Sequence, residues 1–132
     1  MPRFMLDTNI LSDAIRNPKG PASDRMRVLA DETCTSIIVA AELRFGVAKS
    51  GRRRLVSRVE ELLRALEVVA FDSPADVAYG DLRAQLERAG NTIGPNDMLI
   101  AAHALSLGLT LVTDNEREFS RVHGLTIENW LR

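Results

Sequence analysis

Short apolar stretches alternate along the chain with longer amphipathic ones, and this pattern predicts strands that alternate with helices. Four short stretches of apolar or β-branched residues are bounded by polar or turn residues, as buried strands usually are. They cover residues 4–6, 33–37, 68–71 and 109–113, and a shorter edge strand is expected at 125–127. The intervening segments are long enough for crossover connections, so we expect the strands to run parallel.

The segments between these strands carry the signals of helices. Leu55, Val59 and Leu62 recur at helical spacing and predict an amphipathic helix over 53–67. Further helices are expected over 10–16, 23–30, 39–49, 74–90 and 96–107, and one helical turn is expected over 116–120. Ser73 is the expected cap of the 74–90 helix, and Asn96 opens the 96–107 helix. The pattern indicates an α/β protein, a three-layer α/β/α sandwich with a mainly parallel central sheet.

Length and charge narrow the classes of function. The 132 residues suit one domain, and we assign residues 1–132 to it. With 17 Lys plus Arg against 18 Asp plus Glu, the net charge of −1 excludes a polycation that coats nucleic acid through bulk charge. No apolar run approaches the roughly 18–20 residues that span a bilayer, and Asp7 interrupts the first apolar stretch too early for a signal peptide. We therefore expect a cytoplasmic protein without membrane association, with Cys34 as a buried, unpaired thiol.

Four acidic residues stand at related places in the predicted fold. Asp7 and Asp114 directly follow predicted strands, Glu42 lies early in the helix after the 33–37 strand, and Asp97 lies at the start of the 96–107 helix. Ligands of parallel α/β sheets bind where the carboxyl ends of the strands meet. We therefore expect these acids, which are far apart in the sequence, to converge in one cleft.

Clustered carboxylates need compensation. At an effective dielectric constant near 20, two unit charges about 4 Å apart repel by ~4 kcal/mol, a sizeable part of a typical ~5–15 kcal/mol folding stability. A divalent cation removes this repulsion, and a site of oxygen ligands without a His or Cys cluster favours Mg²⁺ or Mn²⁺ over zinc. Such a cation suits the hydrolysis of phosphodiester bonds, because it activates water and neutralises developing charge.

Each acid also has a simpler explanation. Asp7 and Asp97 are well placed to cap helices, Asp114 lies in a polar turn, and Glu42, within an apolar stretch, could belong to a structural ion pair. The joint placement of the four at one sheet edge, rather than any one of them, favours the functional interpretation.

The same residues carry a resemblance to a known family. Residues 5–10 (MLDTNI), the segment from Ser36 to Gly46 with Glu42, residues 97–102 (DMLIAA) and residues 111–115 (LVTDN) with Glu118 resemble PIN-domain ribonucleases. The closest likeness is to VapC-type toxins of bacterial toxin–antitoxin pairs, and it extends over essentially the whole chain.

The resemblance implies a PIN-like α/β/α fold and a Mg²⁺- or Mn²⁺-dependent endoribonuclease, the toxin of a type II toxin–antitoxin system. It implies an RNA substrate, a VapB-like antitoxin that blocks the site, a homodimer, and hetero-oligomers with the antitoxin. Metal-binding acids of the family correspond to Asp7, Glu42 and Asp97, and a supporting hydroxyl corresponds to Thr113. Many relatives have an acid where this chain has Asn115.

The fourth acidic position therefore stays open between Asp114, Asn115 and Glu118. One basic cluster, Arg52–Arg53–Arg54, is a candidate contact for RNA phosphates or an acidic antitoxin segment, or a solvated helix start. The alternative to a nuclease is a non-catalytic PIN-like scaffold that binds RNA or protein.

Overall fold

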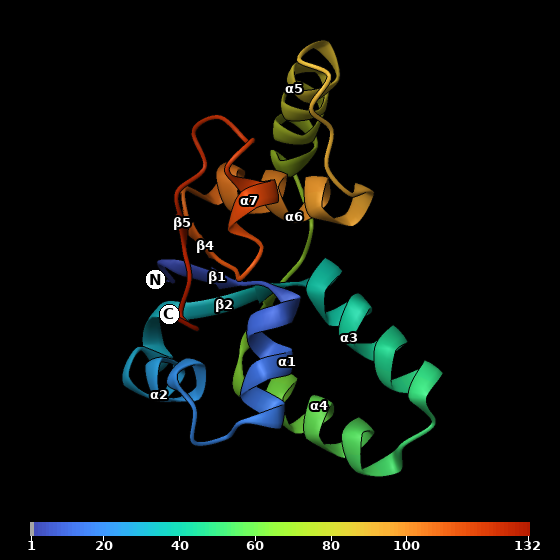
Figure 1. Ribbon diagram of the computed structural model, residues 1–132, viewed down its shortest axis with the longest axis vertical. Helices are drawn as coiled ribbons and strands as arrows, with labels where there is room; N and C mark the ends of the chain where they lie inside the picture. Colours follow the sequence, from blue (N-terminus) through green and yellow to red (C-terminus); the bar gives the residue numbers. More distant parts are fainter. Residues whose placement is uncertain (1) are drawn as a thin grey trace.

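Five short strands form the central sheet of the computed structural model, which describes residues 2–132 (Figure 1). The strands are β1 (Phe4–Leu6), β2 (Thr33–Ser36), β3 (Glu67–Val69), β4 (Thr110–Val112) and β5 (Ile127–Glu128). They lie in the order β3-β2-β1-β4-β5, and each neighbouring pair is parallel. The predicted parallel sheet is confirmed, although β3 begins before the predicted 68–71 stretch and β5 begins where the predicted 125–127 strand ends.

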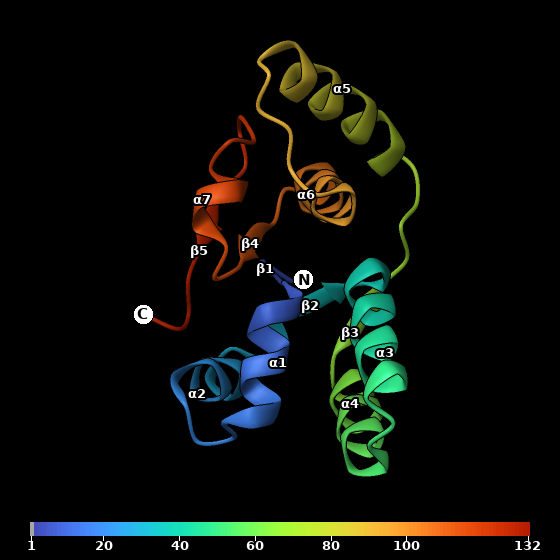
Figure 2. The same ribbon diagram turned by 45° about the vertical axis from the view of Figure 1, so that its right-hand side comes forward.

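Helices cover both faces of the sheet. The helices are α1 (Thr8–Arg16), α2 (Pro21–Val28), α3 (Ile37–Ser50), α4 (Arg53–Ala65), α5 (Ala75–Arg88), α6 (Pro95–Leu107) and α7 (Glu116–Phe119), with a short 3₁₀ helix at Ala30–Glu32. Two views at 45° show α1 to α4 on one face and α5 to α7 on the other (Figures 1 and 2). The predicted three-layer α/β/α architecture is therefore confirmed.

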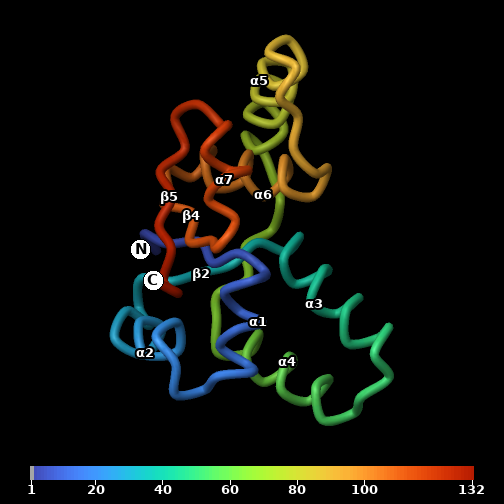
Figure 3. The backbone as a smooth tube through the Cα atoms, in the orientation of Figure 1, coloured from blue at the N-terminus to red at the C-terminus, as the bar shows by residue number. Residues whose placement is uncertain are grey.

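The order in which successive strands are added to the sheet reverses at its middle strand, β1. From β1 it proceeds outward through β2 to β3, then returns through α5 and α6 to β4 on the other side of β1 (Figure 3). A crevice opens in such sheets outside the carboxyl ends of the two strands at which the order reverses. Here those strands are β1 and β4, so the topology alone singles out the segments that follow Leu6 and Val112.

Several helices begin earlier than the sequence predicts. Asp7, with its side chain accepting a hydrogen bond from the Thr8 amide, caps α1, and Ser36 caps α3 by accepting from the Ile38 amide. Helices α2 and α6 instead begin at Pro21 and Pro95, because proline lacks the N–H that a first-turn position leaves unsatisfied.

The expected cap at Ser73 is wrong. Helix α5 begins at Ala75, and its N-cap position, Pro74, makes no side-chain capping bond. The Ala75 amide instead donates to the Asp72 carbonyl, so a backbone turn ends the connection before the helix starts.

Helix α6 lies at the centre of its layer, as its apolar sequence predicts. Ile100, Ala101, Ala102 and Ala104 are fully buried, and α6 packs mainly on α5. Cys34 is buried and unpaired, and burial raises the pKa of its thiol to about 12. Among residues 2–132, no helix combines the length and apolarity needed to cross a bilayer.

Candidate active site

Asp7 occupies the crevice between β1 and β4. Its side chain is buried, and it accepts hydrogen bonds from Thr113 Oγ1 at 2.7 Å and from the Thr8 backbone amide at 2.8 Å. Burial raises the pKa of Asp7, these hydrogen bonds oppose the shift, and the charge of Glu42 raises it further. The capping role of Asp7 is therefore real, but it does not explain why the carboxyl group is buried beside another acid.

Glu42 is held from two directions. Thr8 Oγ1 donates to Glu42 Oε1 at 2.6 Å, and Asn96 Nδ2 donates to Glu42 Oε2 at 3.3 Å. Because Thr8 belongs to α1 and Asn96 to α6, both carboxylate oxygens of Glu42 are fixed by segments that flank the crevice. The ion pair that could have explained Glu42 is absent among residues 2–132, since none of their salt bridges includes it.

Asp97 and Glu118 form a close pair of carboxyl groups. The Gly94 amide donates to Glu118 Oε1 at 2.9 Å, and a Cβ on Gly94 would lie 3.4 Å from Asp97 Oδ2 and 3.9 Å from Glu118 Oε1. Burial raises the pKa of Asp97 to about 7, together with a hydrogen bond to Glu118 and the charges of Asp7, Glu118 and Glu42. The Gly94 hydrogen bond lowers the pKa of Glu118, so of the two carboxyl groups Asp97 keeps a proton to the higher pH.

The structure separates the three candidates for the fourth acidic position. Asp114 is exposed, and its Oδ1 accepts from Asn129 Nδ2 at 3.0 Å. Asn115 donates from its side chain to Glu118 and from its backbone to Thr113 Oγ1. Glu118 is therefore the acid beside Asp97, while Asn115 supports it and Asp114 faces Asn129.

Sequence reasoning missed the polar residues that hold these acids. Asn9 Nδ2 lies 3.4 Å from both Asp7 Oδ2 and Thr113 Oγ1, and Asn9 Oδ1 accepts from the Asp114 amide at 2.9 Å. With Thr8 and Asn96 it connects the segments around the crevice. The available signal was adjacency, because Thr8 and Asn9 directly follow Asp7 and Asn96 directly precedes Asp97.

The basic cluster lies elsewhere. Arg52, Arg53 and Arg54 are exposed at the turn between α3 and α4, at the end of that helical hairpin away from the sheet (Figure 1). The structure does not bring them together with the acids.

In the described part of the chain, no ion pair neutralises the acidic site, although the charge of Arg121 contributes to the lowered pKa of Glu118. None of the salt bridges within residues 2–132 includes Asp7, Glu42, Asp97 or Glu118. Over the same residues, no three His, Cys, Asp or Glu side chains already form a metal-binding group. Hydrogen bonds to neutral groups and a shared proton therefore stabilise the acids. Their all-oxygen donor set and mutual repulsion suit a hard divalent cation, which would displace the proton.

Comparison with known proteins identifies relatives along the whole chain. The PIN domain family matches residues 4–125. The tRNA(fMet)-specific endonuclease VapC of Salmonella typhimurium is 40% identical over 131 residues, which cover 98% of this chain and 99% of that protein.

Solved structures show the same architecture. The DNA-bound VapBC of Salmonella typhimurium contains a chain that matches with a TM-score of 0.94 and 40% identity, covering 98% of this chain and 99% of that one. VapBC-5 of Mycobacterium tuberculosis, a member of the VapBC family of toxin–antitoxin systems, matches with a TM-score of 0.70 and 25% identity, covering 97% and 98% of the two chains.

The raised pKa of Asp97 predicts how pH affects the stability of the metal-free protein. In the folded state Asp97 holds its proton up to about pH 7, whereas an unfolded aspartate releases it near pH 4. The folded state therefore binds more protons between these values, and its stability falls as pH rises through that window. We expect urea unfolding in EDTA to show this fall, and Asp97→Asn to reduce it.

Asp81→Asn is the matched control, because it removes an exposed carboxyl group from α5. It should leave the pH dependence as it is in the unmodified protein. Equal slopes for Asp97→Asn and the unmodified protein would show that Asp97 does not carry the extra proton.

Proposed function

The chain belongs to the PIN-domain family and, within it, to the VapC ribonucleases, and we propose that it is the toxin of a type II toxin–antitoxin system that hydrolyses RNA with Mg²⁺ or Mn²⁺. The observation that carries the metal-dependent mechanism is the convergence of Asp7, Glu42 and Asp97 at the sheet crevice without a neutralising cation among the described residues. Because RNA is the substrate, we place its action in the cytoplasm.

Asp7 and Asp97 are the residues we assign to hold the cation, with Glu42 next to them. Both have carboxyl groups whose pKa values are raised by burial, so a cation that replaces a proton there removes the unfavourable burial of charge. When bound, the cation would lower the pKa of a coordinated water and neutralise charge on the phosphate.

Glu42 is the group we assign to orient the attacking water and to accept its proton. Its two oxygens are fixed by Thr8 and Asn96, which leaves the carboxylate in a defined direction. Water attack in line with the leaving oxygen breaks the phosphorus–O3′ bond. The products are a 5′-phosphate and a 3′-hydroxyl, the latter completed by a proton from solvent.

Thr113, Asn115 and Glu118 support this arrangement. The Thr113 hydroxyl donates to Asp7, and the Asn115 side chain donates to Glu118, which lies beside Asp97. These contacts orient the two assigned metal ligands from the β4 side of the crevice. We accordingly assign Glu118 to the fourth acidic position.

Loss of one assigned ligand tests the mechanism. Asp7→Asn keeps an oxygen that can cap α1 but removes the charge, so we expect RNA cleavage to fall at least about 100-fold, beyond the 10–100-fold typical for groups that merely support ligands. The metal-free variant should be at least as stable as the unmodified protein, because it no longer buries a charge. Cleavage of tRNA and ribosomal RNA with Mg²⁺ or Mn²⁺, and Mn²⁺ titration calorimetry, measure these effects.

EDTA should abolish cleavage, Asp97→Ala should behave like Asp7→Asn, and Asp81→Asn should cleave normally. A protein that binds RNA but does not cut it with either cation would instead support the non-catalytic scaffold. Cleavage that persists in EDTA, or in Asp7→Asn at the full rate, would contradict the metal-dependent mechanism.

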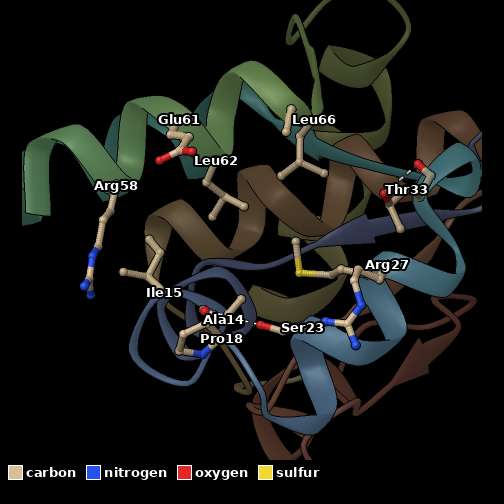
Figure 4. A pocket seen from close by; sticks show the side chains of 13 residues that line it. Ala14, Ile15, Pro18, Ser23, Arg27, Thr33, Arg58, Glu61, Leu62 and Leu66 are labelled. Carbon is tan, nitrogen blue, oxygen red and sulfur yellow. Dashed lines mark hydrogen bonds between the residues drawn. The ribbon is translucent and has the colours of Figure 1, made fainter.

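An apolar groove offers a site for the antitoxin. It has a volume of about 610 Å³ and lies between α1, α2 and α4. Figure 4 shows its apolar side chains, including Ile15 and Leu62, with the charged Arg27, Arg58 and Glu61 also lining it. Because solved relatives form VapBC complexes, we assign this groove to an apolar segment of a VapB-like antitoxin.

Introducing a charge into the groove should weaken antitoxin binding. We expect Leu62→Glu to lower the affinity for a VapB-like antitoxin at least about tenfold, because burying an unpaired carboxylate is costly. Val28→Glu is the matched control, since Val28 is 81% exposed on α2 but does not line the groove. Calorimetry on the purified proteins measures both, and equal affinities would exclude the groove as the docking site.

The predicted homodimer has a candidate surface on α3. Ile37, Ala41 and Phe45 are exposed and follow each other at four-residue intervals, so they form one apolar stripe. Phe45 is 67% exposed. A stripe of this kind suits a twofold interface with a second copy.

A charge at the centre of this stripe tests the dimer. We expect the unmodified protein to elute as a dimer with light-scattering detection, and Phe45→Glu to shift it to the monomer, since two buried carboxylates would face each other across the axis. Val28→Glu should remain dimeric. A dimeric Phe45→Glu would place the interface elsewhere.

A further inference from the structure

His103 is a buried histidine to which the proposed reaction gives no role. It lies in the middle of α6 and is 1% exposed. Asp97 lies six residues earlier in the same helix, almost two turns away, so the imidazole does not reach the crevice. The buried polar ring therefore needs another explanation.

The ring contacts two other segments of the chain. Its Nδ1 lies 2.8 Å from Ser36 Oγ at the end of β2, and its edge-to-face contact with Phe71 has a centroid distance of 5.3 Å. The backbone of Ala70, just after β3, also lies close enough to the ring to oppose the lowering of its pKa. His103 thus joins the α5–α7 layer to the ends of two strands.

The contacts define the protonation of the ring. Ser36 Oγ accepts a hydrogen bond from the Ile38 amide at 3.0 Å, and among residues 2–132 its hydroxyl proton has no acceptor other than Nδ1, so we assign the Ser36 hydroxyl as the donor to Nδ1. Nε2 then keeps the ring proton. Burial lowers the pKa of His103, which favours this neutral ring.

The Ser36 contact matters because it connects α6 to the start of α3, and these two helices carry the acids Asp97 and Glu42. Ser36 caps α3, and Glu42 lies on that helix, while Asp97 lies in the first turn of α6. One further side-chain hydrogen bond links these helices among the described residues, between the exposed Asn96 and Glu42, and it is longer at 3.3 Å. The buried His103–Ser36 bond is therefore the better-protected link between the helices that bear Glu42 and Asp97.

We propose that His103 is a positioning residue of the active site, whose hydrogen bond to Ser36 fixes Glu42 relative to Asp97 and so sets the affinity of the site for its divalent cation. The inference rests on the proposed nuclease function. The proposed role depends on the Nδ1 atom as a hydrogen-bond acceptor, whereas a purely packing role would depend only on the volume of the ring.

Two substitutions distinguish these roles. In His103→Asn the side-chain oxygen can take the place of Nδ1 and accept the Ser36 proton, whereas His103→Leu fills similar space without any acceptor. Mn²⁺ affinity is measured by calorimetry without substrate, and kcat, KM and the Mn²⁺ concentration for half-maximal cleavage are measured with RNA. Circular dichroism confirms folding.

We expect His103→Leu to weaken Mn²⁺ binding roughly tenfold, as typical for a group that orients ligands, and to lower kcat with little change in KM for RNA. His103→Asn should retain most of the affinity. Ser36→Ala should weaken Mn²⁺ binding at least as much as His103→Leu, because it also removes the cap of α3. The double variant should be little worse than Ser36→Ala, because both changes remove one shared interaction.

Ser106→Ala is the matched control, because it removes from α6 a hydroxyl that donates to the His103 carbonyl and lies outside the link. It should leave Mn²⁺ affinity unchanged. The proposal would be overturned if His103→Leu folds and keeps its Mn²⁺ affinity and kcat. If His103→Leu does not fold, the same result in Ser36→Ala would overturn it. Equal losses in His103→Asn and His103→Leu would also overturn it. An unmodified protein that neither binds Mn²⁺ nor cuts RNA would instead refute the proposed function itself.

Discussion

The hydrogen bond from Thr113 to the buried carboxyl group of Asp7 is the contact around which the site is organised. It joins the residues that directly follow β1 and β4, the two strands at which the order of the sheet reverses. At this point the topology leaves a crevice that no crossover helix fills, so a polar side chain can be buried there without displacing the core. A carboxyl group in such a place is destabilising by itself and becomes tolerable through neutral donors, a proton or a cation.

The acids come from both helical layers. Asp7 and Glu42 belong to the side of α1 and α3, while Asp97 and Glu118 belong to α6 and α7. Neutral hydroxyl and amide groups hold Asp7, Glu42 and Glu118, and Asp97 is held by its hydrogen bond with Glu118. These contacts orient the carboxyl groups without placing a positive charge against Asp7, Glu42 or Asp97. Such preorganisation sacrifices stability for function, since full pairing with arginine would be more favourable in the absence of a cation.

Much of this fold follows from the sequence, because short apolar stretches and helical periodicity report burial directly. The helix starts at Pro21, Pro95 and Ala75 were missed because no side chain caps these helices: two begin at a proline, and the third follows a backbone turn at Asp72. Asp7 could be placed at the edge of the sheet from the sequence because it directly follows a predicted strand. The choice among Asp114, Asn115 and Glu118 could not be made, because the neighbours Asp114 and Asn115 point in different directions and the conformation of the loop before α7 decides where Glu118 lies.

The links that hold the layers together were beyond sequence reasoning for another reason. His103 lies six residues after Asp97 on one helix and so faces away from it, and without coordinates such a residue is indistinguishable from any buried polar group. Its partner Ser36 is 67 positions away, and only the packing of α6 against the ends of β2 and β3 brings the two together. A site assembled from two layers is only as well defined as the contacts between the layers. Residues remote from the chemistry therefore have to be judged by which ligand-bearing elements they connect.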